Sequence, residues 1–150
     1  MIQSIEILKF ETDHGLGARA RLGLIVLQTD QTIEYDFARI FCNEDDVSLY
    51  VTRIPNAMEV SPETLRQMAI DLPRAARLLP SQFGFDVVGY GCTSGATLIG
   101  EEEVGKLIRD IHPKAATTNP ITATKAALSA LGTKKIALLT PYPVDVTMTM

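Results

Sequence analysis

The residues best suited to chemistry lie together in one short segment, Gly91-Cys92-Thr93-Ser94-Gly95, directly after an apolar run. Cys92 offers a nucleophilic sulfur, and Gly91 allows the backbone to turn sharply beside it. A thiol near the start of a helix is favoured as thiolate, because the helix start is positive. Consecutive backbone amides at such a turn, together with the hydroxyls of Thr93 and Ser94, can bind a carboxylate. The segment therefore predicts a nucleophile and an anion-binding loop side by side.

A structural cysteine is the competing interpretation, since free cysteine is among the most buried residue types. Other known loops fit the segment less well. It lacks the Gly-Lys-Ser/Thr ending of a phosphate loop, and Ser94 stands where the dinucleotide fingerprint needs its third glycine. A serine nucleophile elbow would need glycine at position 92. The residues alone leave a catalytic and a structural Cys92 both open.

The other reactive side chains have simpler interpretations. Cys42 lies in an acid-rich stretch and is expected to be a loop or packing residue. It lies far from Cys92 along the chain and in an unlike setting, so we expect no disulfide in a cytoplasmic protein. His14 precedes the first predicted strand, and His112 ends a predicted helix, where a cation suits the helix dipole. No spacing typical of metal ligands occurs, so we expect no metal site.

Composition excludes several classes of function. The 150 residues carry a net charge of −4, so no basic field exists to attract nucleic acid or an anionic membrane surface. No apolar run approaches the roughly 18 residues that span a bilayer, and the amino terminus does not resemble a signal peptide. We expect a cytoplasmic protein.

Apolar runs alternate with capped amphipathic segments along the chain. This alternation predicts a three-layer α/β/α fold with a parallel sheet. The main expected strands are Arg21–Leu27, Val47–Ile54, Phe85–Gly91 and Lys134–Thr140, with a short one within 114–118. Expected helices begin at Ser61-Pro62, near Glu101 and at Asn119-Pro120, and Pro73 is expected to kink or divide the first. Cys92 should lie at a strand's carboxyl end, where open parallel sheets bind ligands.

Four segments resemble a known family: LGLIVLQTDQTIE, RIPNAMEVSPETL, GYGCTSGATLIGEE and ALLTPY, within residues 21–145. They are similar to the amino-terminal half of maleate cis–trans isomerases and arylmalonate decarboxylase-like proteins, of the aspartate/glutamate racemase superfamily. The resemblance implies two pseudo-symmetric α/β halves with a cleft between them, and neither cofactor nor metal. It implies a leader over 1–20, a first domain over 21–113, and a second domain that begins at 114–150 and is truncated.

The resemblance also implies roles for single residues. Cys92 matches the first-half catalytic cysteine, where decarboxylase members carry glycine, which favours an isomerase or racemase. Thr93, Ser94 and Tyr142 match residues that bind a substrate carboxylate. Asp30 stands where maleate isomerases often keep asparagine, and an acid there would repel an anionic substrate unless it is protonated or turned aside.

The expected activity is a cofactor-independent, cysteine-dependent isomerisation or racemisation of a small mono- or dicarboxylate. The alternatives are an arylmalonate decarboxylase-like enzyme, an ectoine-utilisation-type relative, a cysteine hydrolase with a histidine near Cys92, and a non-catalytic carboxylate-binding domain. Because 144–150 stop where the pattern calls for a helix, we expect uncovered apolar surface there and a homo-oligomer.

Overall fold

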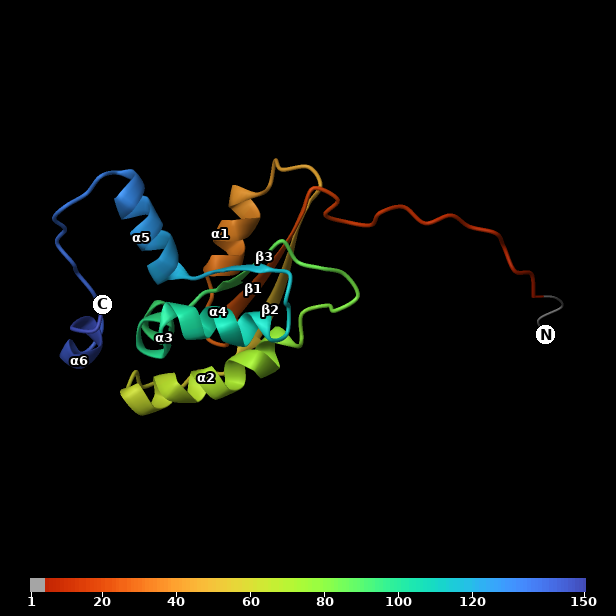
Figure 1. The fold of residues 1–150 in the computed structure, drawn as a ribbon. Coiled ribbons are helices and arrows are strands. Elements are labelled where there is room, and N and C mark those ends of the chain that lie inside the picture. Colours follow the sequence, from red (N-terminus) through yellow and green to blue (C-terminus); the bar gives the residue numbers. More distant parts are fainter. Residues whose placement is uncertain (1–4) are drawn as a thin grey trace.

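The computed structural model describes residues 5–150 and contains a parallel sheet of four strands in the order β2-β1-β3-β4 (Figure 1). The strands are β1 Ala20–Leu27, β2 Val47–Ile54, β3 Val87–Tyr90 and β4 Ala116–Thr118. β2 has the bounds that its β-branched and aromatic residues predict. The helices are α1 Ile33–Ile40, α2 Pro62–Ala76, α3 Thr93–Ile99, α4 Glu101–Arg109, α5 Pro120–Ala130 and α6 Val144–Thr147. The predicted α/β fold with a parallel sheet is confirmed.

The helices lie in two layers around the sheet. In Figure 1, α2 and α4 lie on one side of the strands, and α1 and α5 lie on the other. The main core fills the space between the sheet and α2 and α4, where Ile25, Val88, Leu72 and Ile108 are fully buried. Each such side chain contributes about 1.5–3 kcal/mol through burial. This core holds the end of β3 rigidly, and Cys92 follows that end.

α2 begins as the sequence predicts. The Ser61 hydroxyl accepts a hydrogen bond from the Thr64 amide at 3.3 Å, and the Thr64 hydroxyl accepts one from the Ser61 amide at 3.0 Å. Pro62 occupies the first turn, where its missing N–H costs nothing. Pro73 lies inside the helix, which continues to Ala76, so Pro73 does not divide it.

The expected strand at Lys134–Thr140 is wrong. These residues form no strand, and Ile136, Leu138 and Leu139 are exposed. β-Branched and aliphatic residues favour a strand only where a neighbouring strand pairs with them and a face of the sheet is covered. In this structure the segment pairs with no strand. Within 144–150, where uncovered apolar surface is expected, Val144 and Met148 are exposed and Val146 is buried.

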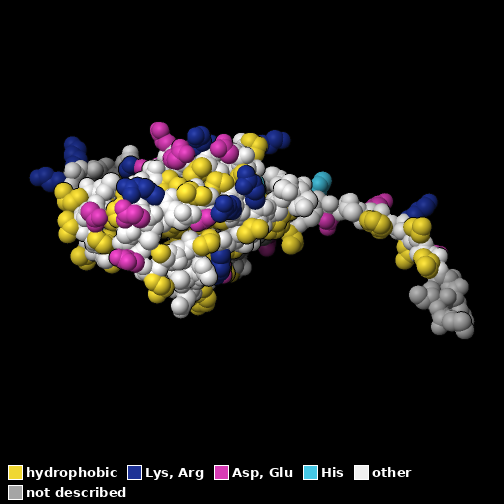
Figure 2. All heavy atoms as spheres, turned by 90° about the horizontal axis from the view of Figure 1, so that it is seen from below, with side chains coloured by type: hydrophobic (Ala, Val, Ile, Leu, Met, Phe, Trp, Pro, Cys, Tyr) yellow, Lys and Arg dark blue, Asp and Glu magenta, His cyan; other side chains and the backbone are white. Residues whose placement is uncertain are grey.

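Figure 2 views the molecule from below, so that α2 lies on the visible face of the domain. Lys and Arg are interspersed with Asp and Glu there, and the face carries no field of a single sign. Among the described residues, no helix is long and apolar enough to cross a membrane.

The strand order places a switch point between β1 and β3. The chain leaves β1 through α1 toward one edge and leaves β3 through α3 and α4 toward the other. Connections that diverge in this way open a crevice at the carboxyl ends of the two strands, and open α/β sheets bind ligands there. Cys92 directly follows β3 at this point.

α5 has no buried side chain and is tied to α4 through Glu101. The Glu101 carboxylate accepts a hydrogen bond from the Thr122 hydroxyl at 2.7 Å and pairs with Lys125. Hydrogen bonds from Lys125 and Thr122 lower the pKa of Glu101. The stabilisation is therefore present above the unfolded-state pKa and is lost as pH falls through the folded-state pKa.

We expect Glu101→Gln to lower the melting temperature at neutral pH and to lose this effect in acid, where the parent carboxylate is also protonated. Thermal melts of both proteins across the acid range measure it. Glu102→Gln, which removes a neighbouring charge from the same turn, is the control. A difference that persists unchanged in acid would contradict the role of the charged form.

Candidate active site around Cys92

Cys92 is the N-cap residue of α3, with an extended backbone at φ −132° and ψ 112°. The pairing of β1 with β3 continues through Gly91, whose amide donates to the Ile25 carbonyl at 2.8 Å. The chain then turns into α3, and the Cys92 sulfur accepts a hydrogen bond from the Gly95 amide at 3.3 Å. The Ser94 hydroxyl lies 3.8 Å from the same sulfur. The predicted neighbourhood of thiol, amide and hydroxyl is present at the carboxyl end of the strand.

The sulfur faces a small cavity, called here the thiol cavity. Its walls include Cys92, Ser94, Leu27 at the end of β1, Asn56 after β2, and Met68 on α2. The volume is about 40 Å³, well below the several hundred Å³ of a typical ligand pocket. Cys92 itself is only 4% exposed. The described chain therefore encloses the sulfur without enclosing a whole ligand.

Thr93 and Tyr142 lie together at a different hollow, called here the outer groove. Its volume is about 320 Å³, and its other walls come from α5, from 136–141 and from Met150. Cys92 and Ser94 do not line this groove. Of the sequence-predicted residues, the structure thus brings Cys92 together with Ser94, and Thr93 together with Tyr142.

Asp30 is turned away from the thiol cavity. Its carboxylate accepts hydrogen bonds from the amides of Thr32 at 2.9 Å and Ile33 at 2.8 Å. These bonds satisfy free amides at the start of α1, where a negative charge is also favoured. The carboxylate is therefore turned aside to the start of α1, which is one of the two arrangements that the sequence leaves for an acid at this position.

Arg53, at the end of β2, holds the same loop and was not singled out in the sequence. Its guanidinium donates to the carbonyls of Leu27 at 2.9 Å and Asp30 at 3.0 Å, and it pairs with Glu34 at 2.9 Å. A planar group with several donors suits this task. Asn56 adds a bond from the Thr29 amide to its side-chain oxygen at 3.2 Å. The loop after β1 is therefore held by two side chains from the end of the neighbouring strand, Arg53 within β2 and Asn56 just after it.

Tyr90 is a second residue that the sequence analysis did not place at the site. It is 1% exposed, and its hydroxyl donates to the Met68 sulfur at 3.7 Å. Burial raises the pKa of Tyr90, and the nearby Cys92 raises it further through its charge and by accepting a hydrogen bond. One signal in the sequence was available, because residues two apart in an extended chain point to the same side.

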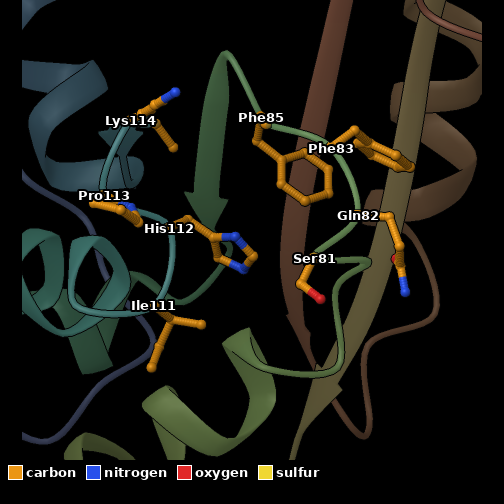
Figure 3. A pocket seen from close by; sticks show the side chains of 10 residues that line it. Ser81, Gln82, Phe83, Phe85, Ile111, His112, Pro113 and Lys114 are labelled. Atoms are coloured by element: carbon orange, nitrogen blue, oxygen red, sulfur yellow. The ribbon is translucent and has the colours of Figure 1, made fainter.

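Neither histidine lies in the Cys92 site. His112 is buried below the amino end of β3, where its Nε2 donates to the Ala76 carbonyl at 2.8 Å and its ring meets Phe85 edge-on. It lines a hollow of about 270 Å³, and Figure 3 shows its ring on the opposite side of that hollow from Phe83 and Gln82, facing Ser81. It is thus a packed and hydrogen-bonded residue, and its amide donates to the Ile108 carbonyl at the end of α4.

His14 lies in the exposed stretch before β1, where its carbonyl accepts a hydrogen bond from Arg21. A cysteine hydrolase needs a histidine base beside its thiol, so this alternative loses its support. Cys42 is exposed, as a loop residue should be. Within residues 5–150, no group of His, Cys, Asp and Glu side chains could hold a metal ion.

No protein family model matches the chain, and no curated protein matches it. Solved structures do. A variant of Nocardia farcinica maleate cis–trans isomerase, with a covalently bound succinylcysteine intermediate, is 22% identical with a TM-score of 0.75. Pseudomonas putida maleate isomerase is 23% identical with a TM-score of 0.66. Both alignments cover 87% of this chain, which spans 56% of the length of those chains. The chain therefore has the fold seen in maleate cis–trans isomerases.

Proposed function

We propose that this chain supplies the nucleophilic half of a cofactor-independent isomerase that acts on a small carboxylate, of the maleate cis–trans isomerase or racemase type. The observation that carries the proposal is the Cys92 sulfur, which lies at the switch point of the sheet and accepts a hydrogen bond from the Gly95 amide. The fold shared with maleate isomerases supports it. So does the succinylcysteine of the Nocardia farcinica enzyme, because addition of a cysteine thiolate to maleate and protonation of the neighbouring carbon form that group.

The reaction balances without an added cofactor. The Cys92 thiolate adds to one alkene carbon, and the π electron pair moves to the other carbon and into its carboxylate. The former double bond is now single and rotates. The carbon–sulfur bond then breaks, the electron pair re-forms the double bond in the trans geometry, and the thiolate returns. Donors that stabilise the charge building on the carboxylate accelerate the addition.

Ser94, whose hydroxyl lies beside the sulfur, is assigned to the carboxylate nearest the reacting carbon. Thr93 and Tyr142, which share the outer groove, are assigned to a more distant carboxylate. Asp30 holds the loop through its bonds to the start of α1 and does not contact the anion in this scheme. The substrate is thus a small acid, with maleate as the first compound to test.

We expect the chain, incubated with maleate and quenched in acid, to carry one succinyl group on the peptide that contains Cys92. Peptide mass spectrometry measures the adduct, and proton NMR of the same mixture measures fumarate. The adduct reports the addition step alone, whereas turnover also requires rotation and release of the thiolate. The Cys42→Ser variant is the matched control, and we expect it to form the Cys92 adduct and fumarate as the parent protein does.

Two outcomes would redirect the proposal. Exchange of the proton α to a carboxylate in heavy water, without fumarate, would select racemisation. Carboxylate binding that is equally strong in Cys92→Ser, with no adduct in the parent protein, would favour the non-catalytic binding domain.

A further inference from the structure

Tyr90 is buried beside Cys92, and the proposed reaction as described makes no use of it. We propose that Tyr90 is a positioning residue whose hydroxyl donates a hydrogen bond to the Cys92 thiolate and so stabilises the reactive form of the sulfur. This inference rests on the proposed function for its purpose. It rests on its own geometry for its evidence.

The first observation is the crowding of the two atoms over Gly95. A Cβ added to Gly95 would lie 2.5 Å from the Tyr90 hydroxyl oxygen and 2.9 Å from the Cys92 sulfur. Both atoms therefore approach the same point above the first turn of α3. The absence of a side chain at position 95 leaves a space that both the hydroxyl and the sulfur border.

The second observation is that the hydroxyl has a poor partner when the thiol is neutral. Its acceptor is the Met68 thioether at 3.7 Å, and a thioether is a weak acceptor. A buried hydroxyl gains much more from a strong acceptor than from a weak one. A thiolate is charged, and hydrogen bonds to charged acceptors are roughly twice as strong as neutral ones. Ionisation of Cys92 would therefore give the Tyr90 hydroxyl a stronger acceptor than Met68.

The third observation concerns the balance of charge at the sulfur. Cys92 is 4% exposed, and burial disfavours a thiolate. Besides Cys92, Glu59 is the ionisable residue that lines the thiol cavity, and no Lys, Arg or His lines it. Hydrogen-bond donors must then stabilise the thiolate. The Gly95 amide donates at 3.3 Å, and the Ser94 hydroxyl, 3.8 Å away, can donate once the sulfur is ionised. We assign the Tyr90 hydroxyl as the third donor, because it approaches the same point above Gly95.

Tyr90 acts in this scheme as a donor and not as a base. Burial is the main cause that raises its pKa, and Cys92 raises it further. The phenol therefore keeps its proton while the thiolate forms, adds to substrate and is released. Loss of the hydroxyl should weaken the thiolate and leave every other proposed step in place.

The test uses the Cys42→Ser background, in which Cys92 is the one remaining thiol. The ultraviolet absorbance of the thiolate is followed against pH, and the rate of Cys92 alkylation by iodoacetamide is followed in parallel. We expect Tyr90→Phe to move the midpoint up by about one pH unit and to slow alkylation at neutral pH about tenfold. Tyr50→Phe, which removes the same atom from the aromatic cluster with Phe83 and Phe85, should leave both measurements unchanged. Met68→Leu, which removes the weaker acceptor, should not raise the midpoint.

A midpoint in Tyr90→Phe equal to that of the parent would overturn the inference. Should Tyr90→Phe not fold, Met68→Leu decides, because it removes the competing acceptor of the Tyr90 hydroxyl: a midpoint raised above that of the parent protein overturns the inference equally. The comparison holds wherever the parent midpoint lies, so it decides the role of Tyr90 independently of maleate. A parent protein that forms no maleate adduct would contradict the proposed function, and the Tyr90 comparison would still be decided.

Discussion

Replacing Cys92 by alanine is expected to lower the isomerisation rate by about a thousandfold or more, because the variant has no sulfur to add to the alkene. The fold should survive, since the side chain contributes little volume to the core. The Gly95 amide loses its acceptor, and the loss of such a cap costs only about 1 kcal/mol. The measurement is fumarate formed from maleate by NMR, with a thermal melt for each protein.

Cys42→Ala is the matched control for this experiment. It removes the same atom from an exposed residue and should change neither rate nor melting temperature appreciably. If Cys92→Ala kept its activity, Cys92 would have no part in the mechanism, and a carboxylate-binding role would become the better interpretation. If Cys92→Ala did not fold, the main role of the Cys92 side chain would be structural.

The second large effect is expected in stability. Leu72 on α2 is fully buried against the sheet and α4, on the helix that also carries Met68 of the thiol cavity. Leu72→Ala should lower the free energy of unfolding by about 2–5 kcal/mol, because burial is lost and a cavity remains. Denaturant titration followed by circular dichroism measures this change.

Leu78→Ala makes the same chemical change just beyond α2. Leu78 is 74% exposed, so its replacement should change the free energy of unfolding by less than about 0.5 kcal/mol. Similar losses in the two variants would show that α2 does not pack on the sheet as described. The pair therefore tests the core that supports the Cys92 site.

Local patterns in the sequence predicted most of the elements around the site. The bounds of β2, the capped start of α2 and the position of Cys92 after β3 all follow from short-range preferences. α1 was not predicted, because its N-cap Thr32 makes no side-chain capping bond and Asp30 performs that task from two residues earlier. The start of α3 at Thr93 was missed as well. Its residues include Thr, Ser and Gly, which favour helices weakly, and burial of Ser94, Gly95 and Ala96 compensates.

The sequence by itself determined that a thiol, two hydroxyls and a permissive glycine follow a buried strand, and that strands alternate with helices. These properties depend on neighbours in the chain. Only the tertiary structure decided that the Tyr90 hydroxyl lies against Met68, that Arg53 and Asn56 hold the loop after β1, and that Lys134–Thr140 remains unpaired. Those outcomes depend on which elements pack against each other across long sequence separations, and local periodicity carries no information about such contacts.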